Sequence, residues 1–140
     1  MIARLRHRLA SDRRAAVSVE FAVAGPLMLA ITMGLVGAGL LSWTRSGLQA
    51  AAYATARCVA LASPACASPA SYAVTLAGQW VFPGIISAGD VAVVQAASCN
   101  GAAGQYTRVT ITGTHWLGSV LPAGQDTITI SVTACHISAV

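Results

Sequence analysis

The sequence contains no lysine and few charged residues of any kind. Charged residues make up 9% of the 140 residues, whereas hydrophobic residues make up 56%. A composition this apolar excludes an intrinsically disordered chain and is unusual for a soluble globular one. The length allows one small domain together with a membrane segment.

Catalytic and metal-binding motifs are also missing. There is no G-x-S-x-G, H-E-x-x-H, Walker or dinucleotide-binding motif, and no C-x-x-C pair. Beyond residue 20 the acids are Asp90 and Asp126, and neither is close in sequence to His115 or His136. Zinc binding would have only the adjacent pair Cys135-His136 to build on. We therefore expect no enzyme activity, no cofactor and no metal site.

Positive charge is concentrated at the N-terminus. The formal net charge is +4, and most of the eight cationic residues come early: Arg4, Arg6, Arg8, Arg13 and Arg14. The remainder has no basic face and no aromatic–basic alternation, so we expect no nucleic-acid partner. A basic leader directly before an apolar run instead indicates a membrane protein with a cytoplasmic N-terminus.

The apolar run covers residues 21–41 and contains no charge. As a helix it would measure about 32 Å, close to the ~30 Å hydrocarbon core of a bilayer. A single carboxylate, Glu20, precedes it, and Trp43 follows at a position where indoles favour the interface. We predict one membrane span, with residues 44–140 outside the cytoplasm. A cleaved signal peptide is the alternative, although its apolar region usually has only ~7–15 residues.

Small residues within the run predict a surface for helix packing. Gly25, Gly34 and Gly37 would let another helix approach closely, although glycines are also common in membrane helices generally. Gly25-Pro26 marks a possible kink, because proline removes a backbone donor.

The helical pattern continues beyond the run. Four residues share one face at three- and four-residue spacings: Leu48, Ala52, Thr55 and Val59. We predict one helix of roughly 45 residues that begins near Ala15 and whose pattern is ended by Pro64. A short second helix is predicted from Ser68-Pro69 to about Phe82, stopped by Pro83-Gly84.

After residue 84 the hydrophobic period changes to two, which predicts strands over residues 90–98, 106–116 and 127–137. Val109 and Ile111 alternate with arginine and threonines, so each strand should have one aliphatic and one hydroxyl-rich face. The predicted connections are residues 100–105 and 117–125.

The predicted fold class is therefore α+β. A long N-terminal transmembrane helix continues into a small head with a short helix and an antiparallel sheet of three strands, or four. We divide the chain into a basic leader (1–15), a transmembrane helix (16–43), a helical extension (44–66) and a head (67–140).

All four cysteines follow the predicted span: Cys58, Cys66, Cys99 and Cys135. An even number outside the cytoplasm indicates disulfides. Three connectivities are possible. We favour Cys58–Cys66 with Cys99–Cys135, because each bond then fastens a local helix end or sheet edge.

The sequence around Glu20 resembles a known family. Residues 13–22, Arg-Arg-Ala-Ala-Val-Ser-Val-Glu-Phe-Ala, followed by Gly25-Pro26-Leu27, are similar to the start of TadE-like minor pilins (pseudopilins) of the tight-adherence, or Tad/Flp, pilus system. Residues 48–58, Leu-Gln-Ala-Ala-Ala-Tyr-Ala-Thr-Ala-Arg-Cys, resemble the helix that follows the span in that family.

The resemblance implies a processing site and an assembly residue. A prepilin peptidase would cut between Ala15 and Ala16, where this chain has alanine in place of the family's usual glycine. Glu20 would then fix the register between subunits. Phe21 fits the TadE-like branch better than the Glu-Tyr pattern of major Flp pilins.

A structural role follows from this resemblance. We expect assembly or initiation of a Tad/Flp-type pilus at the inner membrane, with the prepilin peptidase, other pilins and the Tad assembly platform as partners. The alternative is a membrane-anchored or secreted binding or adhesion module outside the cytoplasm.

Overall fold

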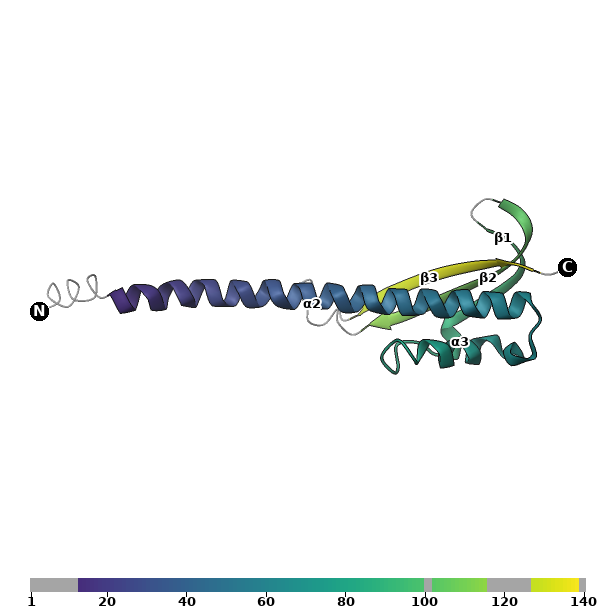
Figure 1. The fold of residues 1–140 in the computed structure, drawn as a ribbon, viewed down its shortest axis with the longest axis horizontal. Helices are drawn as coiled ribbons and strands as arrows, with labels where there is room; N and C mark the ends of the chain where they lie inside the picture. The colour runs from purple at the N-terminus through teal and green to yellow at the C-terminus, as the bar shows by residue number, and fades with distance from the viewer. Residues whose placement is uncertain (1–12, 100–101, 116–126, 139–140) are drawn as a thin grey trace, which may run out of the picture. The chain divides into compact units, whose positions relative to one another are not determined.

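The computed structural model describes residues 13–99, 102–115 and 127–138, which fall into two compact units, one within Met1–Gly39 and one within Leu40–Val140 (Figure 1). From here on the head means this second unit, which is larger than the head of residues 67–140 predicted from the sequence. The chain is mixed α+β, as predicted. Its elements are α2 (Arg13–Ala60), η1 (Pro64–Cys66), α3 (Pro69–Ala77), η2 (Ala88–Asp90), β1 (Val91–Cys99), β2 (Ala102–His115) and β3 (Ile128–Ile137).

The long helix α2 has 48 residues and continues through Pro26. It ends at Ala60, before Pro64, in a turn of the Schellman type. The Ala62 N–H donates to the Val59 carbonyl at 3.0 Å, and the Ser63 N–H donates to the Cys58 carbonyl at 3.2 Å. Ala62 has a φ of 48°, where glycine is the usual residue. The hydrogen-bonded turn therefore terminates the helix before the proline is reached.

The second helix is shorter than predicted. Pro69 is its first residue, as expected, but α3 ends at Ala77 rather than near Phe82. Gly78 is the C-cap, and glycine is a poor helix former. The next residues form a turn in which the N–H groups of Trp80 and Val81 both donate to the Ala77 carbonyl at 2.9 Å. Trp80 therefore lies in this turn and not in the second helix, where the predicted bounds had placed it.

The three predicted strands form an antiparallel sheet in the order β1-β2-β3. The described residues contain no fourth strand. The predicted connection over residues 100–105 is wrong, because β2 already begins at Ala102, which pairs with Cys99. The glycines on either side of that alanine suggested a longer loop. The connection predicted over residues 117–125 lies outside the described residues.

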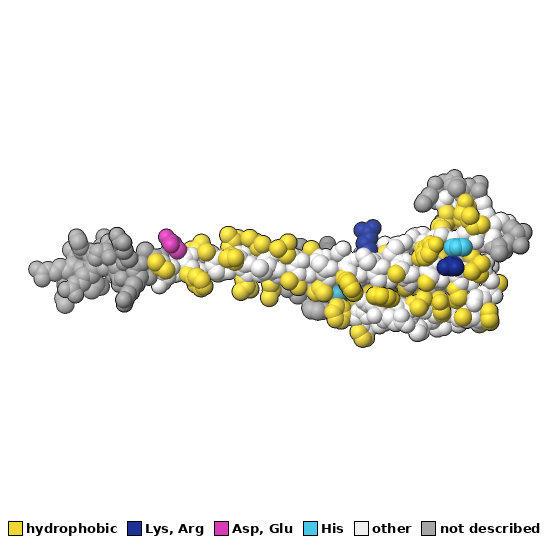
Figure 2. Space-filling model, viewed as in Figure 1, with side chains coloured by type: hydrophobic (Ala, Val, Ile, Leu, Met, Phe, Trp, Pro, Cys, Tyr) yellow, Lys and Arg dark blue, Asp and Glu magenta, His cyan; other side chains and the backbone are white. Residues whose placement is uncertain are grey.

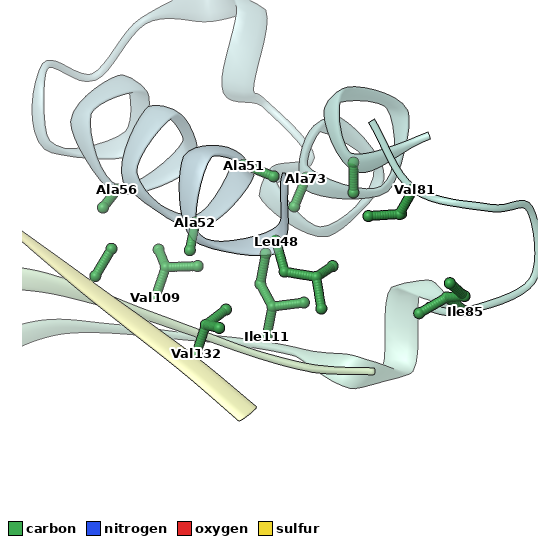
Figure 3. Packing of buried hydrophobic residues seen from close by; sticks show 12 residues of the cluster. Leu48, Ala51, Ala52, Ala56, Ala73, Val81, Ile85, Val109, Ile111 and Val132 are labelled. Atoms are coloured by element: carbon green, nitrogen blue, oxygen red, sulfur yellow. The ribbon is translucent and has the colours of Figure 1, made fainter. Parts of the chain in front are cut away.

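The alternation predicted for the strands is confirmed. Val109 and Ile111 are fully buried, while Arg108 and Thr110 on the opposite face are partly exposed. Figure 3 shows Val109, Ile111 and Val132 of the sheet pointing toward Leu48 and Ala52 of α2. The core of the head thus lies between one face of the sheet and the helices. Its buried members are Leu48, Ala51, Ala52, Ala56, Ala73, Ala77, Val81, Ile85, Val109, Ile111, Val132 and Ala134.

Close approach at one point of this core requires a glycine. A Cβ on Gly113 of β2 would lie 3.0 Å from Ile85 Cγ2 and 3.1 Å from Leu48 Cδ1. The predicted helical face is confirmed at Leu48, Ala52 and Thr55, which are fully buried, whereas Val59 at its end is partly exposed. The part of α2 after residue 43 is therefore a structural element of the head.

Candidate functional site

The N-terminal part of α2 exposes large hydrophobic side chains. On the face in Figure 2, hydrophobic groups (yellow) cover much of the described surface of residues 17–39. The Phe21 side chain is 77% exposed, and the Ile31 side chain is more than half exposed. Among the described residues, one helix is long and apolar enough to cross a membrane, with a mean hydropathy of 1.9. This surface fits a single-pass membrane protein.

Glu20 is the one charged side chain between residues 17 and 44. It is exposed on α2. The positions three and four residues away on either side hold only alanine and valine, so the helix offers no i,i+3 or i,i+4 cation for an ion pair. A carboxylate in such surroundings needs a partner from outside its own helix if it enters the membrane.

The predicted processing site lies at the beginning of the same helix. Ala15 and Ala16 are within the first turn of α2, which starts at Arg13. Phe21, next to Glu20, is among the most exposed hydrophobic residues of the chain. The roles of these residues in processing and register stay predictions.

The predicted packing glycines lie on an open part of the helix. A Cβ on Gly34 or Gly37 would meet nothing within 4 Å, and one on Gly25 would meet only Phe21 Cε1, at 3.9 Å. In the described structure these positions therefore leave space that another helix can approach. Their use in helix packing stays a prediction.

Two disulfides fasten the head, and they have the connectivity favoured from the sequence. Cys58–Cys66 joins the end of α2 to η1, with a Cα–Cα distance of 6.1 Å. Cys99–Cys135 joins β1 to β3, with a Cα–Cα distance of 6.4 Å. The first closes the turn after α2, and the second ties together the two outer strands of the sheet.

A polar turn leads into the sheet. The backbone N–H and the hydroxyl of Ser87 both donate to Asp90 Oδ2, at 2.8 and 2.7 Å. These two bonds stabilise the charged carboxylate, so the pKa of Asp90 is lowered, with the hydroxyl as the larger cause. Asp90 therefore stabilises the turn that precedes β1, and it is not a proton donor near neutral pH.

The histidines and acids that the structure describes do not form a metal site. Within residues 13–99, 102–115 and 127–138, no three His, Cys, Asp or Glu side chains lie close enough to hold a metal ion. His115 is buried at the end of β2 and packs edge-on against Phe82, with ring centroids 6.5 Å apart. His136 packs against Tyr53 at 6.3 Å. Both rings serve packing in this structure.

A contact not expected from the sequence joins α2 to the turn after α3. The Trp43 indole Nε1–H donates to the Trp80 backbone carbonyl at 2.8 Å. The sequence placed Trp43 at the membrane interface and Trp80 within the second helix, predicted to end near Phe82, so it did not connect the two.

Comparison with known families identifies the N-terminal helix. Residues 15–57 match the family model of TadE-like proteins. The match confirms the TadE-like resemblance and covers Ala15, Ala16, Glu20 and the helical residues of α2 that enter the head core. No curated protein and no solved structure matches the chain significantly. The TadE-like segment therefore includes both an exposed apolar surface and a buried alanine-rich one.

Proposed function

We propose that the protein is a minor pilin (pseudopilin) that takes part in assembling or initiating a Tad/Flp-type pilus. The TadE-like match carries this proposal, because the family suggests a protein associated with the Tad pilus. The matched residues contain the apolar helix and its lone carboxylate. The role is structural rather than enzymatic.

In this proposal the helix first anchors the protein in the inner membrane. The basic leader keeps the N-terminus in the cytoplasm, and the head lies in the periplasm. Two disulfides support this location, since disulfides persist in an oxidising compartment. The prepilin peptidase then cuts between Ala15 and Ala16, which places Glu20 fifth in the mature chain.

In this proposal the cut creates a positive charge that can pair with the Glu20 carboxylate. A new α-amino group on Ala16 is mostly charged at neutral pH. A carboxylate at the bilayer centre costs about 2.5–3.5 kcal/mol on insertion scales, and less near the interface. Pairing Glu20 with the amine of a neighbouring subunit offsets part of that cost. It therefore favours assembly and sets the axial register between subunits.

N-terminal sequencing of the protein purified from its membrane tests the processing step. A chain that starts at Ala16 supports the proposal. A chain that starts between residues 45 and 65 would show that signal peptidase had removed the apolar run, and the protein would then be a secreted binding module. An intact Met1 would indicate a plain membrane anchor.

Substitution of Glu20 tests the assembly step separately. We expect Glu20→Gln to reduce incorporation into pili while leaving membrane insertion unchanged, because only the charge is lost. Glu20→Asp is the matched control and should retain most incorporation. Normal pili with the Gln variant would contradict the register role.

A further inference from the structure

Three aromatic side chains form an exposed group on the head, which we call the aromatic cluster: Trp43, Trp80 and Phe82. The Trp43 indole is hydrogen-bonded to the Trp80 carbonyl at 2.8 Å. A groove of about 390 Å³ follows the cluster and is lined by residues without charge. These residues are Leu40, Trp43, Gln79, Trp80, Val81, Phe82 and Pro83.

The cluster does not belong to the core of the head. Trp43, Trp80 and Phe82 are 59%, 53% and 55% exposed, whereas Val81 between the latter two is buried. Val81 therefore anchors the turn while its two aromatic neighbours project outward. Aromatic residues are the usual source of buried area in a core, so three of them left outside need a different environment.

The turn is held against α2 by a close backbone approach. Gly47 lies one helical turn after Trp43, and a Cβ there would come within 2.9 Å of Trp80 Cβ and 3.1 Å of Val81 Cγ1. Only a residue without a side chain leaves this space. Trp80 is consequently fixed between Trp43 and Gly47 along the helix, with its carbonyl bonded to Trp43.

The level of Trp43 is set by the apolar run. Trp43 comes two residues after the run ends at Leu41, which is a rise of about 3 Å along a helix. If residues 21–41 cross the bilayer, Trp43 lies at its boundary, and the residue bonded to it lies there too. Tryptophan rings favour this boundary because they combine an apolar body with a polar N–H.

We propose that the aromatic cluster is a lipid-docking surface, through which Trp80 and Phe82 of the head insert into the outer interfacial layer of the membrane. The membrane would then hold the head at two points of the sequence, the helix and the turn after α3. This inference rests on the membrane anchoring in the proposed function. A second copy of the chain is the competing occupant of the same surface.

Fluorine NMR of the full chain in lipid nanodiscs tests the proposal with all contacts retained. The protein carries 5-fluorotryptophan, and its resonances are assigned with single Trp→Phe variants. Lipids with a nitroxide near the start of the acyl chain are then added. We expect several-fold broadening of the Trp43 and Trp80 resonances.

A Leu61→Trp variant supplies an internal control. Leu61 is exposed and directly follows the last residue of α2, about 27 Å from Trp43 along the helix axis. Its resonance should be unaffected by the nitroxide. If Trp80 resembles position 61 while Trp43 is broadened, lipid docking is wrong but anchoring stands. If neither tryptophan is broadened, the membrane anchoring itself fails. A Trp80 signal that shifts with protein-to-lipid ratio and is shielded from the nitroxide would identify a second copy as the occupant, and overturn the proposal.

Discussion

The two parts of α2 are both helical, but they differ in which side chains they expose and which they bury. Residues 17–36 expose large side chains such as Phe21 and Leu35, while residues 44–60 bury small ones such as Ala52 and Ala56. Monomeric soluble proteins rarely expose an apolar patch larger than a few hundred square ångströms. The first part is therefore suited to lipid or neighbouring helices. Small residues in the second part let the sheet approach the helix closely.

This difference also determines what stabilises each part. The head has a core of six alanines, three valines, two isoleucines and one leucine, which is a modest amount of apolar area. It is supplemented by two disulfides. The N-terminal part buries almost nothing within the described structure, so its stability depends on the surroundings it enters.

Removing the disulfide that closes the longer loop should reduce the stability of the head most. Cys99 and Cys135 are 36 residues apart, so replacing both with alanine should lower the free energy of unfolding by about 4 kcal/mol. The same change at Cys58 and Cys66, 8 residues apart, should cost about 2.5 kcal/mol. Urea unfolding of the full chain in detergent micelles, followed by near-UV circular dichroism, measures both. Equal losses would show that loop length does not control the contribution.

A charge placed in the exposed apolar surface should reduce membrane insertion and leave the stability of the head unchanged. Ile31→Arg puts a cation in the middle of the apolar run, at a cost of about 2.5–3.5 kcal/mol for membrane insertion. Ala50→Arg, on the exposed side of α2 in the head, should change stability by less than about 0.5 kcal/mol. Carbonate extraction of membranes measures the inserted fraction. If both variants insert equally well, the exposed apolar surface is not a membrane span.

One substitution made in both parts of the molecule sharpens the same comparison. Gly113→Val adds atoms where a Cβ would already lie 3.0 Å from Ile85, and should destabilise the head by about 1–3 kcal/mol. Gly34→Val fills open space and should leave the unfolding of the head unchanged. Thermal unfolding of the two variants in micelles separates these outcomes. A destabilised Gly34→Val head would mean that the two units are energetically linked.

The strong periodic signals in the sequence predicted most of the fold. Alternation of Val109 and Ile111 with polar residues identified the second strand and its buried face. The even number of cysteines indicated disulfides, and a preference for local bridges favoured the pairing that the structure contains. The apolar run before Trp43 identified the exposed part of α2. In each case side-chain pattern and local backbone preference point to the same structure.

Errors arose where hydrogen bonding or tertiary contact decided the outcome. The helix stop at Ala77 depends on the turn that follows Gly78, and not on the proline that the sequence displays more clearly. The start of β2 at Ala102 depends on its pairing with Cys99. The Trp43–Trp80 bond joins residues 37 positions apart, and no local pattern reports it. The proposed role of Glu20 involves a neighbouring subunit, which the sequence of one chain does not contain.

The smallest predicted effect concerns the exposed turn of Ser87 and Asp90 at the start of the sheet. Hydrogen bonds from Ser87 lower the pKa of Asp90 in the folded head, so the ionised carboxylate contributes stability above the unfolded pKa of about 3.9. That contribution is lost as the pH falls through the lower, folded pKa. Asp90→Asn removes it at every pH. The stability difference between wild type and variant should therefore be constant near neutrality and shrink below about pH 4. Denaturant unfolding of both chains between pH 7 and pH 3 measures this gap, and a gap that widens in acid would show that Ser87 does not favour the charged form.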